Sequence, residues 1–516
     1  MQQNTAQILK PPYLLAPQVR LSWQHFIQGA AGAQRLASLK KAITKMKSLN
    51  ASPKTSADYR RSWEYWANIH GYYGPQSPDG TVAQQVAWLN ANGFSSYVSY
   101  YNGITDQVPP DALATLIWAT CEHSGGNGPG PNPGPTPAPG QANFFGWHRM
   151  YVYYFEQVLR WAANDNTLRL PYWDYTDPAN VALPAAFRTT NAVLYDAKRR
   201  PTMNSGASTL SPNSTNIDTL LTHANYFGFE WDIETGVHGY VHCVTGPTCP
   251  VAHMGDVPVA GNDPVFYDHH DNIDRIWACW QHLHPTPGGA WQAQQFSFVD
   301  GTGAKVTKPV SAFINTTALG YVYENYTSCA RPGTKPLKIR LLASLAAVRA
   351  TTVLGSSKAI AIKAPQTTID IAVPKPALRR ALANLTTAET TTLTLRDVAA
   401  DQPPGTLFNV YLVKRGNAAS RMLVGTISWF AAFRHHGQET PYKRTLTYDV
   451  TAIMRDLGGP ALADSGVSVV IEATDGTVST GGATAVTARN DAFKAFRTES
   501  NLRIGAVELR SGAPAK

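Results

Sequence analysis

Several features are scarce in this chain of 516 residues, and each absence excludes a class of protein. Charged residues make up only 15%, against about 25% in ordinary globular domains, whereas hydrophobic residues make up 43%. A chain of this composition can bury a sizeable core, so it is not largely disordered. No run of 18 apolar residues is present, which predicts no transmembrane helix and no membrane partner.

The chain also has few cysteines and only a small excess of basic over acidic residues. The five cysteines are too few, and odd in number, for a disulfide framework, and residues 1–17 have no secretory signal pattern. We therefore expect a cytoplasmic protein as the chain is written, with export by another route left open. The 44 basic and 35 acidic residues leave a net charge of +9 without a block of five Lys or Arg residues. So mild an excess predicts no nucleic-acid partner.

Histidine and aromatic residues divide the chain into two parts. Twelve of the 14 histidines lie at or before His284, among helix-like patterns of large apolar residues. From about Leu337 the sequence changes to short β-branched or alternating runs separated by turn residues, which is typical of a sandwich or barrel. We expect a mainly α domain over residues 1–330, a linker over 331–336, and a C-terminal all-β, sandwich-like domain over 337–516.

The later part of the helical region contains histidines at metal-ligand spacing. His238 and His242 are four residues apart, so both imidazoles lie on one face of a predicted helix. His270 lies near the start of another helical pattern, and Asp274 follows four residues later. At this spacing the Asp274 carboxylate is predicted to orient the His270 ring by a hydrogen bond without binding the metal itself. A zinc protease would have Glu directly after His238, but that position is Gly239. The pair alone is a weak signal, since it also arises by chance.

A second set of histidines strengthens the metal interpretation. His70 ends one aromatic helical pattern, His123 lies in a Cys-Glu-His segment, and His148 opens another aromatic pattern. Two sets of three imidazoles, without a thiolate cluster or a carboxylate-rich triad, favour copper over zinc, calcium or non-haem iron. The alternative for any single histidine is a core or helix-capping role.

Three segments resemble the copper-site signatures of type-3 copper proteins, which are the tyrosinases, catechol oxidases and molluscan haemocyanins. The segments are FFGWHRMYVYYFEQVLR (144–160), LRLPYWDYT (168–176) and NDPVFYDHHDNIDRIW (262–277). The resemblance covers roughly residues 20–326 and extends more loosely over the C-terminal part. It implies a four-helix bundle that holds a dinuclear copper site, with O2 as co-substrate. It also implies structural roles for Arg20 and for the Tyr-x-Tyr motif at 321–323.

The resemblance further implies two sets of three copper ligands. The first set is His70, His123 and His148, and the second is His238, His242 and His270. His269, directly before His270, is implied to be a non-ligand. Cys121, two residues before His123, matches the Cys-x-His spacing of the family's Cys–His thioether, and a buried free thiol is the alternative.

Two carboxylates are candidates for the base that takes the phenol proton. Glu234, four residues before His238, is implied to hold a water near the second copper. Glu230, one turn earlier, is the second candidate, and a solvated carboxylate on the helix flank is the alternative for either. Val257, thirteen residues before His270, matches the family's gate above the first copper, where a small side chain leaves room for a phenol ring.

Two further positions beside the second set of histidines bear on activity. Gly239 stands where many tyrosinases have Asn, which removes one suggested helper for phenol deprotonation. Cys243 directly follows His242 at a position that varies in the family, and the sequence leaves open whether it pairs with Cys249.

The C-terminal domain is implied to lie over the substrate entrance as a lid. Three aromatic rings, Trp429, Phe430 and Phe433, lie close together near the end of a predicted strand. Because alternate side chains of a strand face opposite sides, Phe430 and Phe433 do not both belong to the core unless the chain bends. One of them is a candidate placeholder for a phenol ring in the copper pocket. The alternative puts all three rings in the sandwich core.

The resemblance and the small gate residue together predict a tyrosinase, which hydroxylates monophenols and oxidises o-diphenols to o-quinones with O2. The alternatives are a catechol or o-aminophenol oxidase and a haemocyanin-like O2 carrier. Two copper ions per chain are the expected cofactors, and small phenols are the expected substrates. The sequence leaves open a homo-oligomer and a copper-loading protein partner.

Overall fold

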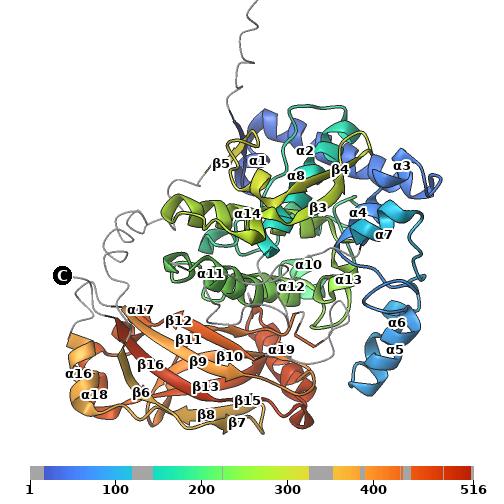
Figure 1. Ribbon diagram of the computed structural model, residues 1–516. Coiled ribbons are helices and arrows are strands. Elements are labelled where there is room, and N and C mark those ends of the chain that lie inside the picture. The colour runs from blue at the N-terminus through green and yellow to red at the C-terminus, as the bar shows by residue number, and fades with distance from the viewer. Residues whose placement is uncertain are drawn as a thin grey trace, which may run out of the picture.

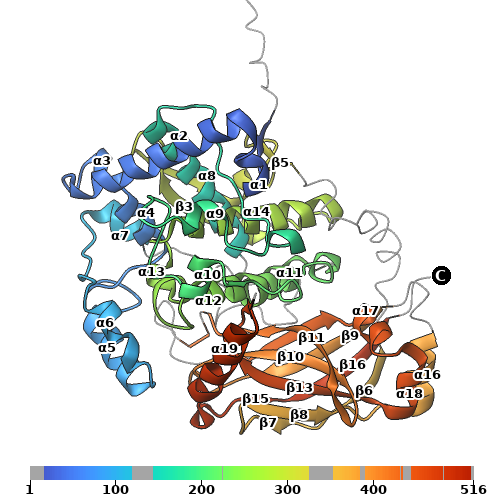
Figure 2. The ribbon, with the colours of Figure 1, turned by 180° about the vertical axis from the view of Figure 1, so that it is seen from behind.

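The computed structural model describes a helical part and a β-rich part that lie against each other (Figures 1 and 2). The described residues are 17–118, 143–223, 225–324, 352–383, 390–430, 432–433, 443–479 and 481–512. Cys121, His123 and the expected linker at 331–336 lie outside these residues. Of the helices in the described stretches, none is both long enough and apolar enough to cross a membrane.

The helical part surrounds a large buried core that is rich in aromatic rings (Figure 1). Its helices are α1 (Trp23–Phe26), α2 (Gly29–Ser48), α3 (Ala57–Arg60), α4 (Trp63–His70), α5 (Val82–Ala91), α6 (Val98–Tyr101), α7 (Ala112–Trp118), α8 (Phe144–Ala163), α9 (Ala185–Arg188), α10 (Pro201–Ser205), α11 (Tyr226–Asp232), α12 (Gly239–Thr245), α13 (Val257–Ala260) and α14 (Pro264–Leu283). Its strands are β1 (Gln18–Arg20), β2 (Ser208–Thr209), β3 (Gln295–Val299), β4 (Lys305–Pro309) and β5 (Tyr321–Tyr323).

Local sequence explains where the two longest site helices begin and end. Asp263 caps α14 by accepting a hydrogen bond from the Val265 backbone N–H (3.0 Å), and Pro264 fits the first turn because no N–H is needed there. Helix α8 ends at Ala163, and the next residue, Asn164, closes the last turn in a left-handed conformation (φ 52°). A π-helical turn, Ile233–His238, connects α11 to α12.

Within its described residues, the C-terminal part contains two four-stranded antiparallel sheets, ordered β11-β10-β13-β8 and β12-β9-β16-β6. A second apolar core, made mainly of aliphatic side chains, packs between them. The strands are β6 (Thr352–Ser356), β7 (Ile360–Ala361), β8 (Gln366–Asp370), β9 (Thr390–Val398), β10 (Leu407–Lys414), β11 (Asn417–Ile427), β12 (Arg444–Asp449), β13 (Val467–Thr474), β14 (Val478–Ser479), β15 (Arg503–Ile504) and β16 (Ala506–Gly512).

This architecture confirms the expected mainly α part followed by a β-sandwich. The sandwich also contains helices that its strand pattern did not predict: α16 (Lys375–Ala383), α17 (Thr451–Asp456), α18 (Leu462–Ser465) and α19 (Gly482–Ala495). Helix α19 has no strong apolar stripe and is held on β13 by polar contacts such as Arg489 to Glu472 (3.1 Å). Periodicity alone therefore could not reveal it.

The β-rich part lies against α11 and α12, the helices that lead into the second set of histidines (Figures 1 and 2). Strand β14 pairs with β2 of the helical part. The Tyr240 hydroxyl donates to the Gly476 carbonyl (2.7 Å), and Arg444 donates to the Thr235 carbonyl (3.2 Å). These contacts attach the sandwich directly to α12, which carries His242, and to the π-helical turn that ends at His238.

Candidate dinuclear metal site

Helices from distant parts of the sequence bring histidines to one buried centre. Among the described residues, two groups are present in which all ring-nitrogen donors lie within 4.8 Å of one another. The first is His70, His148 and His270, and the second is His238, His242, His269 and His270. Because His270 belongs to both groups, the two clusters are contiguous. His238 and His242 lie together in the second cluster, as their spacing predicts.

A shared hydrogen-bond pattern fixes which ring nitrogen each histidine presents. Nδ1 donates to a backbone carbonyl in all five, since a carbonyl can only accept. The bonds run from His70 to Val257 (3.0 Å), His148 to Phe144 (2.7 Å), His238 to Glu234 (3.0 Å), His242 to Met254 (2.8 Å) and His270 to Phe266 (2.9 Å). Each ring therefore keeps its proton on Nδ1 and presents the Nε2 lone pair to the centre.

Burial keeps these rings in the form that binds metal. Desolvation lowers the pKa of His238 to about 3, and burial with neighbouring imidazoles lowers the pKa of His148, His242 and His270 well below the usual value. Buried Nε2 atoms of His242 and His270 have no hydrogen-bond partner among the described residues. A donor set of neutral imidazoles, with no carboxylate in either cluster, fits copper.

His269 differs from its neighbour His270 in how its ring is held. Its Nδ1 lies 2.8 Å from the Tyr175 hydroxyl rather than against a backbone carbonyl. A hydroxyl can donate or accept, so this contact does not fix the proton on Nδ1. The His269 ring nevertheless lies within the second cluster, so its non-ligand role stays a prediction.

The predicted partnership between Asp274 and His270 is wrong. The His270 ring bonds to the carbonyl of Phe266, four residues earlier in α14. The Asp274 carboxylate instead accepts hydrogen bonds from Arg149, from the Tyr321 hydroxyl (2.6 Å) and from the Tyr323 hydroxyl (2.6 Å). A fully buried carboxylate needs a countercharge, and an imidazole held neutral by its own helix cannot supply one.

The same buried network contains the residues expected to be structural. Arg20 donates to Glu156 (2.9 Å) and to Asp271 (2.5 Å), and its guanidinium lies 3.8 Å from the centre of the Tyr321 ring. Strand β1 pairs in parallel with β5, which sets Arg20 opposite Tyr323. The network ties the start of the helical part to its end.

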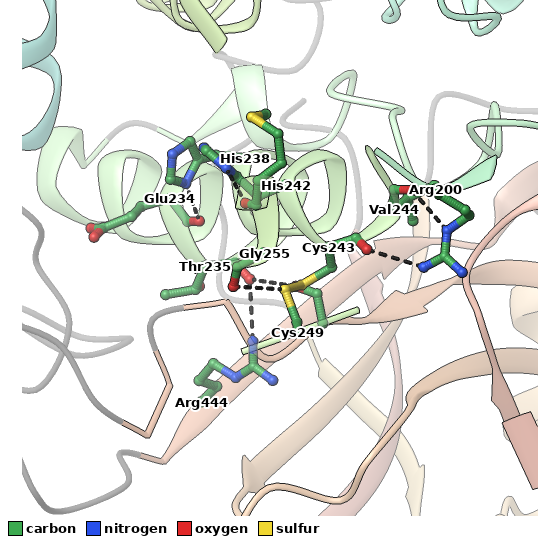
Figure 3. The surroundings of a disulfide bond; sticks show 12 residues. Arg200, Glu234, Thr235, His238, His242, Cys243, Val244, Cys249, Gly255 and Arg444 are labelled. Atoms are coloured by element: carbon green, nitrogen blue, oxygen red, sulfur yellow. Dashed lines mark hydrogen bonds between the residues drawn. A yellow bond between two sulfur atoms is a disulfide. The ribbon is translucent and has the colours of Figure 1, made fainter. Parts of the chain in front are cut away.

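The two candidate carboxylates have different surroundings. Glu230 Oε1 accepts hydrogen bonds from the Phe145 backbone N–H (3.0 Å) and the Tyr226 hydroxyl (3.2 Å), so it links α11 to the start of α8. Glu234 is 4% exposed and lies in the π-helical turn that ends at His238 (Figure 3). Such turns often occur at functional sites because they redirect a side chain.

Val257 contacts a histidine of the first cluster, and Gly239 lies against the C-terminal part. Val257 begins α13, is buried, and accepts the His70 hydrogen bond through its carbonyl. A Cβ atom at Gly239 would lie 3.2 Å from Phe430 Cβ and 3.3 Å from Ser428 Oγ. The C-terminal segment therefore occupies the space that a larger side chain at position 239 would need.

Cys243 and Cys249 form a disulfide directly beside the second cluster (Figure 3). Arg200 donates to the carbonyls of Cys243 (3.3 Å) and Val244 (2.9 Å) and contacts Asp475 of the sandwich (3.3 Å). The bond closes the loop that follows His242, a pairing the sequence had left open.

The three clustered aromatic rings separate into two environments. Phe430 stacks on His242, with ring centres 4.0 Å apart and planes 13° apart, and lies edge-on to His238 at 5.3 Å. Trp429 and Phe433 pack in the sandwich core, 5.7 Å from each other. Strand β11 ends at Ile427, so the chain is free to turn Phe430 away from that core.

Aromatic residues of the helical part also line the site, and residue patterns did not single them out. Phe266 lies 4.0 Å from the His270 ring and 4.6 Å from the His70 ring. Phe144 lies 4.6 Å from His148 and 4.8 Å from His238. Both are in the recognised copper-site segments, but spacing alone does not distinguish a site aromatic from a core aromatic.

The fold and the site together define a class, a helical protein whose two contiguous imidazole clusters are suited to hold two metal ions, with a β-sandwich packed against them. A family model described as the common central domain of tyrosinase matches residues 60–215 and 183–283. The chain is 32% identical over 224 residues to the chloroplastic polyphenol oxidase of Malus domestica, a match that covers 35% of this chain and 37% of that protein.

Two further similarities extend the match. The chain is 27% identical over 316 residues to tyrosinase HcTyr1 of a Hahella species, which covers 55% of this chain and 59% of that protein. It has the fold of latent apple tyrosinase, with a TM-score of 0.50, 18% identity, and coverage of 98% of this chain and 99% of that one. The sequence matches thus span less than two thirds of either curated relative. The chain belongs to the tyrosinase and polyphenol oxidase family of type-3 copper proteins.

Proposed function

We propose that this protein is a tyrosinase, a copper-dependent oxidase that hydroxylates small monophenols and oxidises o-diphenols to o-quinones with O2. The observation that supports the proposal is the pair of contiguous imidazole clusters, whose rings are buried and are held through Nδ1. When bound, two copper ions would supply the one-electron redox chemistry that O2 activation requires.

Different residues of the chain would bind the metal ions, accept the phenol proton and exclude water. The proposed ligands are His70, His123 and His148 for one copper, and His238, His242 and His270 for the other. Glu234 would hold the water that accepts the phenol proton, because the substrate must bind as phenolate. The aromatic rings of Phe144 and Phe266 exclude bulk water from the rings they contact.

Substrate range depends on the space above the clusters. Val257 is small enough to leave room for a phenol ring, which favours monophenol hydroxylation. Gly239 favours the alternative, a catechol or o-aminophenol oxidase, because it supplies no amide beside His238 to help deprotonate a monophenol. Both alternatives keep the same copper ligands and the same small phenolic substrates.

Copper reconstitution followed by O2 uptake tests the proposal. L-tyrosine, catechol and o-aminophenol are supplied in parallel to protein that contains about two coppers per chain. Uptake with all three supports a tyrosinase, and uptake without L-tyrosine supports the narrower oxidase. Reversible O2 binding without turnover of any phenol would contradict an enzyme and favour an O2 carrier.

We further propose that the C-terminal domain keeps the enzyme latent. Phe430 is 3% exposed and lies flat on a proposed copper ligand, where a phenol ring would otherwise stack. Burial of one aromatic side chain contributes about 2–3 kcal/mol, which is enough to favour the closed state and small enough for mild treatments to reverse.

Phe430→Ala is expected to raise kcat/KM for catechol by on the order of tenfold, since it removes the ring that competes with substrate. Cleavage within 331–336 should raise it further. Phe433→Ala is the matched control. It also removes a phenyl ring, but from the sandwich core, and it leaves the contact between Phe430 and His242 in place. Equal catechol kinetics for the wild type, Phe430→Ala and cleaved protein would show that the domain serves assembly or stability instead.

A further inference from the structure

One short loop orients a histidine of each cluster. The carbonyl loop, residues 252–257, joins the disulfide-closed segment to α13. Its Met254 carbonyl accepts from His242 (2.8 Å), and its Val257 carbonyl accepts from His70 (3.0 Å). The loop therefore contacts one proposed ligand of each copper.

The other described ligands do not depend on this loop. His148, His238 and His270 each donate to the carbonyl four residues earlier in their own helical segment. Helix geometry fixes those three acceptors, because successive turns bring the ring over that carbonyl. His70 and His242 instead take their orientation from a segment outside their helices, so their positions depend on how firmly the carbonyl loop is held.

The backbone of the carbonyl loop is strained. Ala252 has φ 62° and His253 has φ 53°, and both residues carry side chains. This left-handed region is unfavourable for residues with a Cβ and persists only where the surrounding structure imposes it. Something outside the loop must therefore hold it in place.

Two buried tyrosines provide that restraint. The Tyr101 hydroxyl donates to Asp256 Oδ2 (2.6 Å) and accepts from the Ala252 backbone N–H (2.8 Å), so it contacts both ends of the loop. The Tyr73 hydroxyl donates to the same carboxylate oxygen (2.7 Å). Burial, and then the Asp256 charge, raises the pKa of both tyrosines well above 10, so both hydroxyls stay protonated.

We infer that Tyr101 is a positioning residue for both metal ions, acting through Asp256 and Ala252 on the carbonyls that orient His70 and His242. Tyr73 assists through Asp256 alone. The inference rests on the proposed dicopper function and deepens it. It predicts that loss of the Tyr101 hydroxyl weakens retention of both coppers together, although His70 and His242 lie in different helices, α4 and α12.

Copper release from Tyr101→Phe tests this inference. The full-length protein is loaded with copper, exposed to excess chelator, and the copper per chain is followed with time, beside the thermal midpoint of the metal-free protein. Both coppers are expected to leave about tenfold faster than from the wild type, the lower end of the effect of removing a direct partner of a metal ligand, because Tyr101 acts one step further out. Tyr73→Phe is expected to show a smaller acceleration.

Tyr59→Phe is the matched control. It removes a buried hydroxyl that donates to a carboxylate, Glu64 (2.7 Å), at the end of α4 remote from His70. Its copper release is expected to equal that of the wild type. A lower thermal midpoint for Tyr101→Phe with wild-type release would overturn the inference, and so would faster loss of only one copper. If Tyr101→Phe does not fold, wild-type release from Tyr73→Phe overturns it.

The two levels of proposal fail in different ways. Wild-type protein that retains two coppers but oxidises no phenol contradicts the proposed oxidase and leaves the release measurements valid. Wild-type protein that is active, with variants that release copper at the wild-type rate, contradicts the positioning role of Tyr101 alone.

Discussion

Replacement of His242 by alanine is expected to abolish oxidation of both catechol and L-tyrosine. The change removes one of the three imidazoles proposed for the second copper and would leave an incomplete ligand set. Copper content should fall from about two ions per chain to about one, because the first cluster keeps its own ligands. Metal analysis of the purified variant and O2 uptake measure the two effects separately.

Two other histidines serve as controls for this variant. His284 is buried outside both clusters and bonds to the Leu221 carbonyl (2.9 Å), so His284→Ala tests the general cost of losing a buried imidazole. It is expected to keep two coppers. His269→Ala should reduce turnover without removing a metal ion, since its ring is held by Tyr175 rather than by a carbonyl. A folded His242→Ala protein with two coppers and normal catechol oxidation would contradict the ligand assignment.

Glu234→Gln is expected to depress hydroxylation of L-tyrosine far more than oxidation of catechol. Loss of a positioned base costs about 10²–10⁴-fold where proton transfer limits the rate. A monophenol depends on that proton transfer before oxygen insertion, whereas a catechol offers a second, adjacent hydroxyl. Steady-state kinetics with both substrates, at equal copper content, give the ratio that decides the role.

Glu230→Gln is the matched control for the base assignment. Its carboxylate oxygen already accepts hydrogen bonds from Phe145 and Tyr226, so its loss should affect the packing of α8 and lower both activities together. Equal losses on the two substrates for Glu234→Gln would indicate a structural role there as well. A selective loss of monophenol activity in Glu230→Gln would transfer the base role to that residue.

Local pattern was enough to predict much of this protein. The i, i+4 spacing of His238 and His242 places both rings in one cluster, because a helix repeats every 3.6 residues. The alternating runs near 390–398 and 467–473 became β9 and β13 for the corresponding reason in strands. The strand pattern after Leu337 also predicted the sandwich, and family motifs implied a copper site that no single spacing could have identified.

Contacts between segments distant in the sequence determined the features of the site that local pattern did not predict. Whether Phe430 or Phe433 faces the histidines depended on where β11 ends and how the sandwich sits on α12. Spacing predicted Asp274 as a partner of His270, but Arg149, 125 residues earlier, donates a hydrogen bond to the Asp274 carboxylate.

The restraint on the carbonyl loop also comes from distant residues, since Tyr101 lies 155 residues before Asp256. Sequence spacing fixes which side chains share a face of one element. It does not fix which face of another element they meet, because that depends on packing and on the pairing of buried charges throughout the folded chain.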